Sequence, residues 1–116
     1  MDSSDPLYTH QLIEGRRSAA ESTLMDIAQR EQQYILDQRA YAYGTNIASV
    51  SANLNVTIPS TVQQFYTITV APGSTTTPPS FIATATPVAG SVQASDVTLT
   101  IDQTGQKLTQ NPSGTW

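Results

Sequence analysis

The stretch from Leu7 to Gln38 constrains the fold of this chain most, because its apolar residues return with the spacing of one long helix. They recur three, four and seven residues apart, which places them on one face. These residues are Leu12, Ile13, Ala20, Leu24, Ile27, Ala28, Tyr34 and Ile35. The charged residues between them, Glu31 included, are predicted to lie mostly on the opposite side. Good helix formers dominate, and Gly15 interrupts them at a cost of roughly 1 kcal/mol.

This helix is longer than the domain that follows it can cover. About thirty residues at ~1.5 Å each form a rod of ~45 Å, whereas a compact domain of about 100 residues has a radius of gyration of ~13 Å. No later segment keeps a helical period, so a sheet must bury the apolar face. We expect the first turns, with Tyr8, Leu12 and Ile13, to remain uncovered and to pack on other copies of the chain.

Three later segments alternate apolar residues with threonine, which is the period of a β-strand: residues 65–70, 81–86 and 97–101. The residues expected on the buried face are Tyr66, Ile68, Val70, Phe81, Ala83, Ala85, Val97, Leu99 and Ile101. One buried and one solvated face is typical of an antiparallel sheet, and short connectors favour a meander. The predicted fold is therefore α+β, with a long N-terminal α-helix packed on a three- to four-stranded antiparallel β-meander.

A chain of 116 residues has room for one domain. We interpret residues 1–5 as an engineered replacement start and residues 6–116 as that single domain. Gly44 is the residue best suited to a left-handed cap after the helix. The expected segments are a helix (6–41), a connection with one helical turn near Ile47 to Ala52 (42–62), a sheet (63–102) and a C-terminal loop (103–116).

The composition excludes several classes of protein. The net charge is −4, from nine acidic and five basic residues, and Lys107 is the only base outside the helix and the residues just after it. No aromatic residues join these bases in a cluster, which argues against a general nucleic-acid groove. The chain has no cysteine, so it has neither a disulfide nor a thiolate metal site. Without a run of 18 apolar residues or a signal-peptide pattern, we expect the chain as given to be soluble.

The sequence offers no constellation for catalysis. His10 is the only histidine, and nothing near it in the sequence would orient it as a base. The many serine and threonine hydroxyls also lack an activating partner. We therefore expect neither an enzyme nor a cofactor. Asp96, Asp102 and Asn111 could converge on a calcium ion, although their spacing is not that of a dense ligand set, and this alternative stays open.

Five stretches in a fixed order carry a family resemblance. They are Pro6-x-Tyr8 with Arg17 nine residues on; the run rich in small, acidic and Gln-Glu residues from Ala19 to Tyr34; Arg39 to Ala42; Tyr66 to Val70 followed by Phe81 to Pro87; and Leu99 to Gly105 followed by Trp116. Each stretch alone is weak evidence for a family. Together, in their order and spacing over almost the whole chain, they resemble the type IV pilins, and most closely the PilE-like minor pilins.

The resemblance implies a structural subunit of a type IV pilus, and a minor rather than a major pilin. Such a subunit assembles through its N-terminal helix and serves adhesion, twitching motility or DNA uptake. The implied subunit-packing residues are Pro6, Tyr8, Leu12, Ile13, Arg16 and Arg17, and the implied C-terminal loop presents Asp102, Gly105, Lys107 and Trp116. The implied partners are other pilin subunits and the inner-membrane assembly machinery. The implied location is the inner membrane before assembly and then the extracellular pilus fibre of a Gram-negative bacterium.

Two features depart from the family pattern. Pilins begin with an apolar helical half that anchors the subunit in the inner membrane, and none precedes Pro6, so we interpret the chain as an N-terminally truncated domain. Relatives also commonly close the C-terminal loop with a disulfide, at places that correspond to Val97 and Thr115. Without that bridge, packing of Leu108 and Trp116 and hydrogen bonds must close the loop.

Two alternatives remain within the same fold. The first is a DNA-binding or surface-binding pilin. Some pilins bind DNA through a basic stripe, which Lys107 alone does not supply, so DNA is a possible partner that the charge does not support. The second is a pseudopilin of type II secretion, which predicts calcium-dependent thermal stability.

Overall fold

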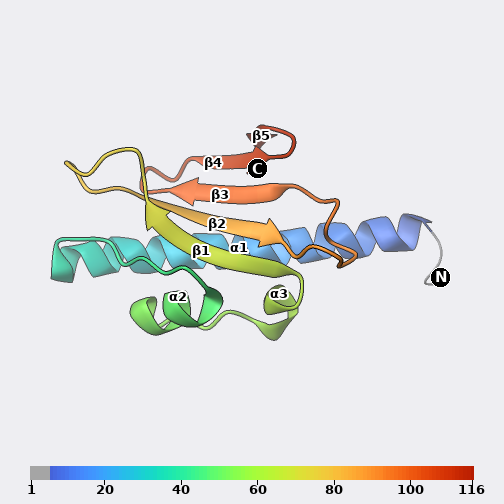
Figure 1. Cartoon of the computed structure of the whole chain (residues 1–116), viewed down its shortest axis with the longest axis horizontal. Coiled ribbons are helices and arrows are strands. Elements are labelled where there is room, and N and C mark those ends of the chain that lie inside the picture. Colours follow the sequence, from blue (N-terminus) through green and yellow to red (C-terminus); the bar gives the residue numbers. More distant parts are fainter. Residues whose placement is uncertain (1–5) are drawn as a thin grey trace.

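The computed structural model describes residues 6–116, so the expected replacement start at residues 1–5 lies outside the described residues. The α1 helix spans Pro6–Gln38 and is 33 residues long. It begins at a proline, whose fixed φ and missing N–H suit a first helical turn. Figure 1 shows that α1 runs behind the sheet and continues past it toward the N-terminus. The prediction of one long helix that outruns its sheet is therefore confirmed.

The helix ends earlier than predicted. Arg39, not Gly44, has the left-handed φ, at 60°. Gly44 instead forms an antiparallel bridge with Val70, in which N–H and C=O of each residue pair at 2.9 Å. A Cβ on Gly44 would lie 2.8 Å from atoms of Ser49 and Val50, so this close approach explains the glycine.

The sheet has five antiparallel strands in the order β1-β2-β3-β4-β5, which confirms the α+β meander and adds to the predicted strands. The strands are β1 (Tyr66–Pro72), β2 (Phe81–Pro87), β3 (Thr98–Asp102), β4 (Lys107–Gln110) and β5 (Gly114–Thr115). The register pairs Thr69 with Thr84 and Thr84 with Thr100, so threonines stand side by side on the outer face.

The expected C-terminal loop is instead a continuation of the sheet. Asp102 organises the turn before β4, because its Oδ1 accepts hydrogen bonds from the N–H groups of Thr104 (2.9 Å) and Gln106 (3.1 Å). Gly105 has a φ of 83° there, which confirms the expected turn at this residue. The chain then reverses direction and forms β4, which pairs with β3. The short strand β5 pairs with β4 and is the last strand of the sheet.

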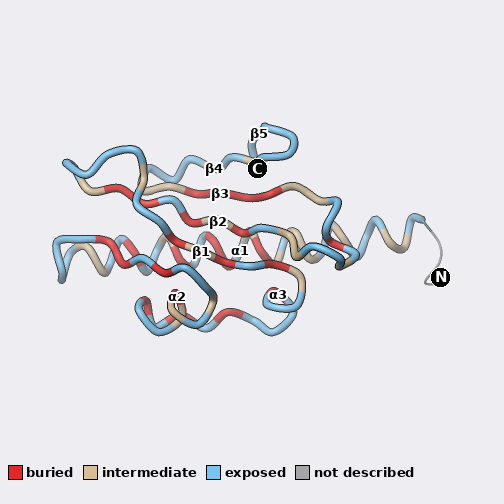
Figure 2. Tube along the Cα trace, in the orientation of Figure 1, coloured by how far each residue is buried: buried red, intermediate tan, exposed pale blue. Residues whose placement is uncertain are grey.

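The core lies between α1 and the inner face of the sheet, where the buried segments meet (Figure 2). All the predicted inward residues of β1 and β2 are buried, and so are Leu99 and Ile101, whereas Val97 is only half-buried. From α1 the core receives Ala20, Thr23, Leu24, Ile27 and Glu31. The alternation breaks in β3, where Thr98 and Thr100 are also buried because the long side chains of Gln110 and Leu108 stand opposite them.

The connection between α1 and β1 carries two short helices, α2 (Ile47–Leu54) and α3 (Ser60–Gln63). The α2 helix, predicted as a single turn, is a complete helix with a capping box: Asn46 Oδ1 accepts from Ser49 N–H at 2.8 Å, and Ser49 Oγ accepts from Asn46 N–H at 3.2 Å. Both helices flank the β1 edge of the sheet (Figure 1).

Candidate functional site

The first turns of α1 carry the predicted subunit-packing residues. Pro6, Leu7 and Leu12 are exposed, and Tyr8 and Ile13 are half-buried. The exposed fractions of Leu7 and Leu12 are 56% and 36%. This end of α1 extends beyond the sheet (Figure 1). Of the three residues predicted to be uncovered, Leu12 is exposed, whereas Tyr8 and Ile13 are half-buried. Within residues 6–116, no helix combines the length and the apolar character needed to cross a membrane.

The predicted packing residue Arg17 is half-buried and binds a carboxylate of the same chain. Its Nε donates to Asp96 Oδ2 at 2.7 Å, and its Nη2 forms a second hydrogen bond to Oδ1. Burial acts to raise the pKa of Asp96, but the hydrogen bonds and charge of Arg17 prevail and lower it, and the pKa of Arg17 is raised in turn. The pair joins α1 to the loop before β3.

A buried amide extends this contact. Gln93 is fully buried, and its Nε2 lies within hydrogen-bond distance of Ile13 O (3.0 Å), Tyr66 Oη (2.9 Å) and Asp96 Oδ2 (3.1 Å). Burial raises the pKa of Tyr66 to about 12, so the phenol stays neutral. We call Arg17, Tyr66, Gln93 and Asp96 the loop anchor, because they fix the β2–β3 connection against the helix.

The other polar residues near the helix start have local partners. The guanidinium carbon of Arg16 lies 3.9 Å from the centroid of the Phe65 ring, a cation–π contact. His10 pairs with Glu14 at 3.0 Å on the exposed side of α1. His10 therefore lies on the surface of the helix, beside a carboxylate one turn away.

The predicted C-terminal residues are spread over the end of β3 (Asp102), the turn after it (Gly105), β4 (Lys107) and the end of the chain (Trp116). The Lys107 ammonium lies 5.6 Å from the centroid of the Trp116 ring. Trp116 donates from Nε1 to Thr100 O at 2.8 Å and packs against the core, so it closes this edge as expected. Leu108, expected to help, lies on the outer face and is 38% exposed. Lys107 and Trp116 together form the cation–indole pair.

The three candidate calcium ligands have separate surroundings. Asp96 belongs to the loop anchor before β3, whereas the Asp102 carboxylate accepts hydrogen bonds in the turn after β3. Asn111 lies in the turn after β4. Among residues 6–116, no three acidic or histidine side chains are grouped to hold a metal ion. The structure thus does not bring the predicted ligand set together.

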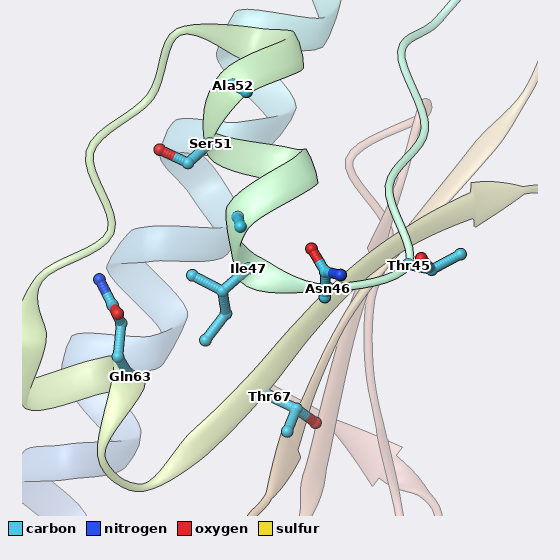
Figure 3. A pocket seen from close by; sticks show the side chains of 8 residues that line it. Thr45, Asn46, Ile47, Ser51, Ala52, Gln63 and Thr67 are labelled. Atoms are coloured by element: carbon cyan, nitrogen blue, oxygen red, sulfur yellow. The ribbon is translucent and has the colours of Figure 1, made fainter.

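Sequence reasoning missed a groove beside the β1 edge, between α2 and α3 (Figure 3). Its volume is about 630 Å³, and its lining is uncharged: Thr45, Asn46, Ile47, Ala48, Ser51, Ala52, Gln63 and Thr67. Much of this polar lining already bonds within the chain; Gln63 Nε2, for example, donates to Ile58 O at 2.7 Å. A run of small and amide residues in the connection was the only sequence signal for it.

The basic residues do not form a patch. Arg17 is paired and Arg16 is stacked, which leaves Arg30, Arg39 and Lys107. Gln32 donates to Gln103 O in the β3–β4 turn, near Lys107, at 3.2 Å. Arg30 lies two residues before Gln32, about 200° around the helix, and so faces away from that turn. Lys107 and Arg30 thus do not share one surface.

A comparison with protein families supplies the identity. The family model described as type IV minor pilin ComP, DNA uptake sequence receptor, matches residues 6–101, which is most of the chain. Neither a curated protein nor a solved structure gives a significant match. The matched residues include α1, both short helices, β1, β2 and most of β3. The sequence resemblance rests on α1 and these strands and also on residues up to Trp116, beyond the matched part. The chain belongs to the type IV minor pilin ComP family.

Proposed function

We propose that this minor pilin contacts DNA through its cation–indole pair while its N-terminal helix holds it among other pilus subunits. As a member of its family, the chain is a structural subunit of a type IV pilus involved in DNA uptake. The family is described as a DNA uptake sequence receptor, which supports DNA as the ligand of this chain also. A catalytic activity forms no part of the proposal.

The observation that carries the DNA contact is the position of Lys107. It is the one base on the sheet, and it stands beside a half-exposed indole that is anchored by a hydrogen bond to β3. A lysine held over an aromatic ring presents its ammonium to solvent in a restricted position, and phosphate oxygens are natural partners for such a group. Uncharged groups would then have to supply any sequence discrimination.

Assembly through α1 is supported by its uncovered apolar surface. Pro6, Leu7 and Leu12 are exposed in the first turns of α1, and this end of the helix extends past the sheet (Figure 1). An exposed apolar patch of this kind marks an interaction site. In this proposal, the partners are other pilin subunits and the inner-membrane assembly machinery, and the subunit passes through the inner membrane before it enters the fibre.

The single tryptophan makes the DNA contact directly measurable. A DNA duplex that carries the uptake sequence should change Trp116 fluorescence in a saturable way at low salt. Lys107→Gln should weaken binding roughly three- to tenfold, because one phosphate contact is lost.

Arg30→Gln is the matched control, since it removes the same charge from an exposed site remote from the β3–β4 turn. It should bind like the unmodified chain. Binding that leaves Trp116 fluorescence unchanged, or that Lys107→Gln and Arg30→Gln weaken equally, would refute the cation–indole pair as the DNA contact. Absence of binding at low salt would refute the DNA proposal for the single subunit.

A further inference from the structure

Glu31 is a carboxyl group enclosed between α1 and the segment that follows it. Its exposed fraction is 0%. Oε1 accepts a hydrogen bond from Ala42 N–H at 2.8 Å, whereas Oε2 is buried and has no hydrogen-bond partner among the described residues. A buried carboxylate oxygen without a donor is costly, so this group has a structural reason to bind a proton.

Within the part of the chain that the structure describes, no ion pair joins a cation to the Glu31 carboxyl. Among the elements packed against α1, the strand β2 and the helices α2 and α3 contain no titratable residue, and β3 contains only Asp102, which is bonded within its own turn. The segment that follows the helix contains the exposed Arg39 and the phenols of Tyr41 and Tyr43. Tyr43 donates to Ser80 O at 2.9 Å, and its pKa is raised, first by burial and then by the charge of Glu31.

The hydrogen bond from Ala42 ties Glu31 to a structural junction. Tyr41 and Ala42 are buried just after the helix end, and Gly44 pairs with Val70 on the edge strand β1. The same segment leads directly into α2 and the wall of the uncharged groove. Whatever loosens residues 41–44 therefore loosens the attachment of α2 to the sheet.

We propose that Glu31 is a proton-dependent latch, which holds residues 41–44 against the helix when it is neutral and releases them to water when it is ionised. On release the carboxyl gives its proton to solvent, and water hydrates the charged oxygens. Burial supports this device, because it raises the pKa of Glu31 to about 7 even though the Ala42 N–H favours the charged form. Opening therefore becomes more favourable as the pH rises from about 4.5 to about 7.

Amide hydrogen exchange at Ala42, Gly44 and Val70 tests the latch on the folded chain. We expect the protection factors of these amides to fall roughly 50-fold between pH 5 and pH 8, because the opened state binds fewer protons than the closed state. The Ala42 amide shift should titrate with a midpoint near 7. Amides in the β2–β3 ladder should stay better protected than these three at each pH.

Glu31→Gln should make the three protection factors independent of pH, and the exposed Glu14→Gln should leave the wild-type dependence unchanged. If Glu31→Gln does not fold, the pH midpoint of the Ala42 amide shift in the wild-type chain tests the latch by itself. A midpoint near 4.5, or equal protection factors at pH 5 and pH 8 in the wild-type chain, would overturn the latch.

Discussion

At the scale of single residues, Glu31 shows how a helical pattern can be misread. The sequence was expected to place its charge on the solvated side, but the spacing of Ala20, Leu24, Ile27 and Glu31 is four, three and four, which puts all four on one face. The charge of Glu31 suggested an exposed position, whereas its spacing along the helix places it on the buried face. The buried carboxyl then sets the pH at which the whole chain is most stable.

Global stability should decline as the pH rises through neutrality. The native state keeps a proton on Glu31 up to a pKa of about 7, whereas the unfolded chain loses it near 4.5, so the native state binds more protons in this interval. The stabilisation is fully present below about pH 4.5 and is lost as the pH rises through about 7. Urea unfolding should show a loss of about 2 to 3 kcal/mol between pH 5 and pH 8. A Glu31→Gln variant with the same decline would contradict this account.

The loop anchor makes an opposite prediction at low pH. Asp96→Asn should lower the free energy of unfolding by about 2 kcal/mol at pH 7, because a charged hydrogen-bond acceptor of Arg17 is lost. Since the pKa of Asp96 is lowered in the folded chain, this stabilisation is present above the unfolded value of about 3.8 and disappears as the pH falls below it. Thermal unfolding of Asp96→Asn measures this stabilisation, and the exposed variant Asp37→Asn is the control. Equal effects of the two variants would argue against the anchor.

At the scale of elements, sequence periodicity predicted the helix and the strands in which apolar residues recur at a regular spacing. It missed the elements that are too short to show such a spacing. The long helix and three strands are long enough for their apolar residues to recur with a helical or a strand period. In β1, for example, Tyr66, Ile68 and Val70 recur at every second position. The β4 strand has only four residues and an exposed leucine, so its pairing depends on the turn at Asp102 rather than on its own pattern. The groove also escaped prediction, because its walls come from three separate elements.

Two glycines should respond to alanine in opposite ways. Gly44→Ala should lower the free energy of unfolding by about 1 to 3 kcal/mol, because its Cβ would collide with Ser49 and Val50. Gly15→Ala meets no atom within 4 Å and lies in the middle of α1, so it should raise the free energy by about 0.5 to 1 kcal/mol. Chemical denaturation of both variants measures the difference. Stabilisation by Gly44→Ala would show that α2 does not dock against the sheet as described.

At the scale of the whole molecule, the small number of basic residues limits the DNA contacts that one subunit could make under the proposed function. The chain has a net charge of −4, and Lys107 is its only base on the sheet. A duplex that lies over Lys107 thus meets few positive groups from the same copy. Tight binding would require several copies, or other subunits of the fibre, to contribute contacts together.

The salt dependence of binding should reflect this distribution. For the isolated chain, the logarithm of the binding constant should fall with the logarithm of salt concentration with a slope of about −1, as expected for about one phosphate contact. Fluorescence titrations at several salt concentrations give the slope. A value of about −4 would show that one subunit supplies a basic surface that the structure does not contain.

We propose that pilus assembly depends on the exposed start of α1, and incorporation into fibres tests this proposal most directly. The chain should be produced with the apolar N-terminal helix of a pilin ahead of Pro6, in a bacterium that makes type IV pili, and then detected in sheared fibres. We predict that the unmodified chain is present, that Leu12→Glu reduces its amount at least about tenfold, and that the exposed loop variant Val92→Glu has little effect. A chain absent from the fibres, or a Leu12→Glu variant incorporated as well as Val92→Glu, would contradict the account.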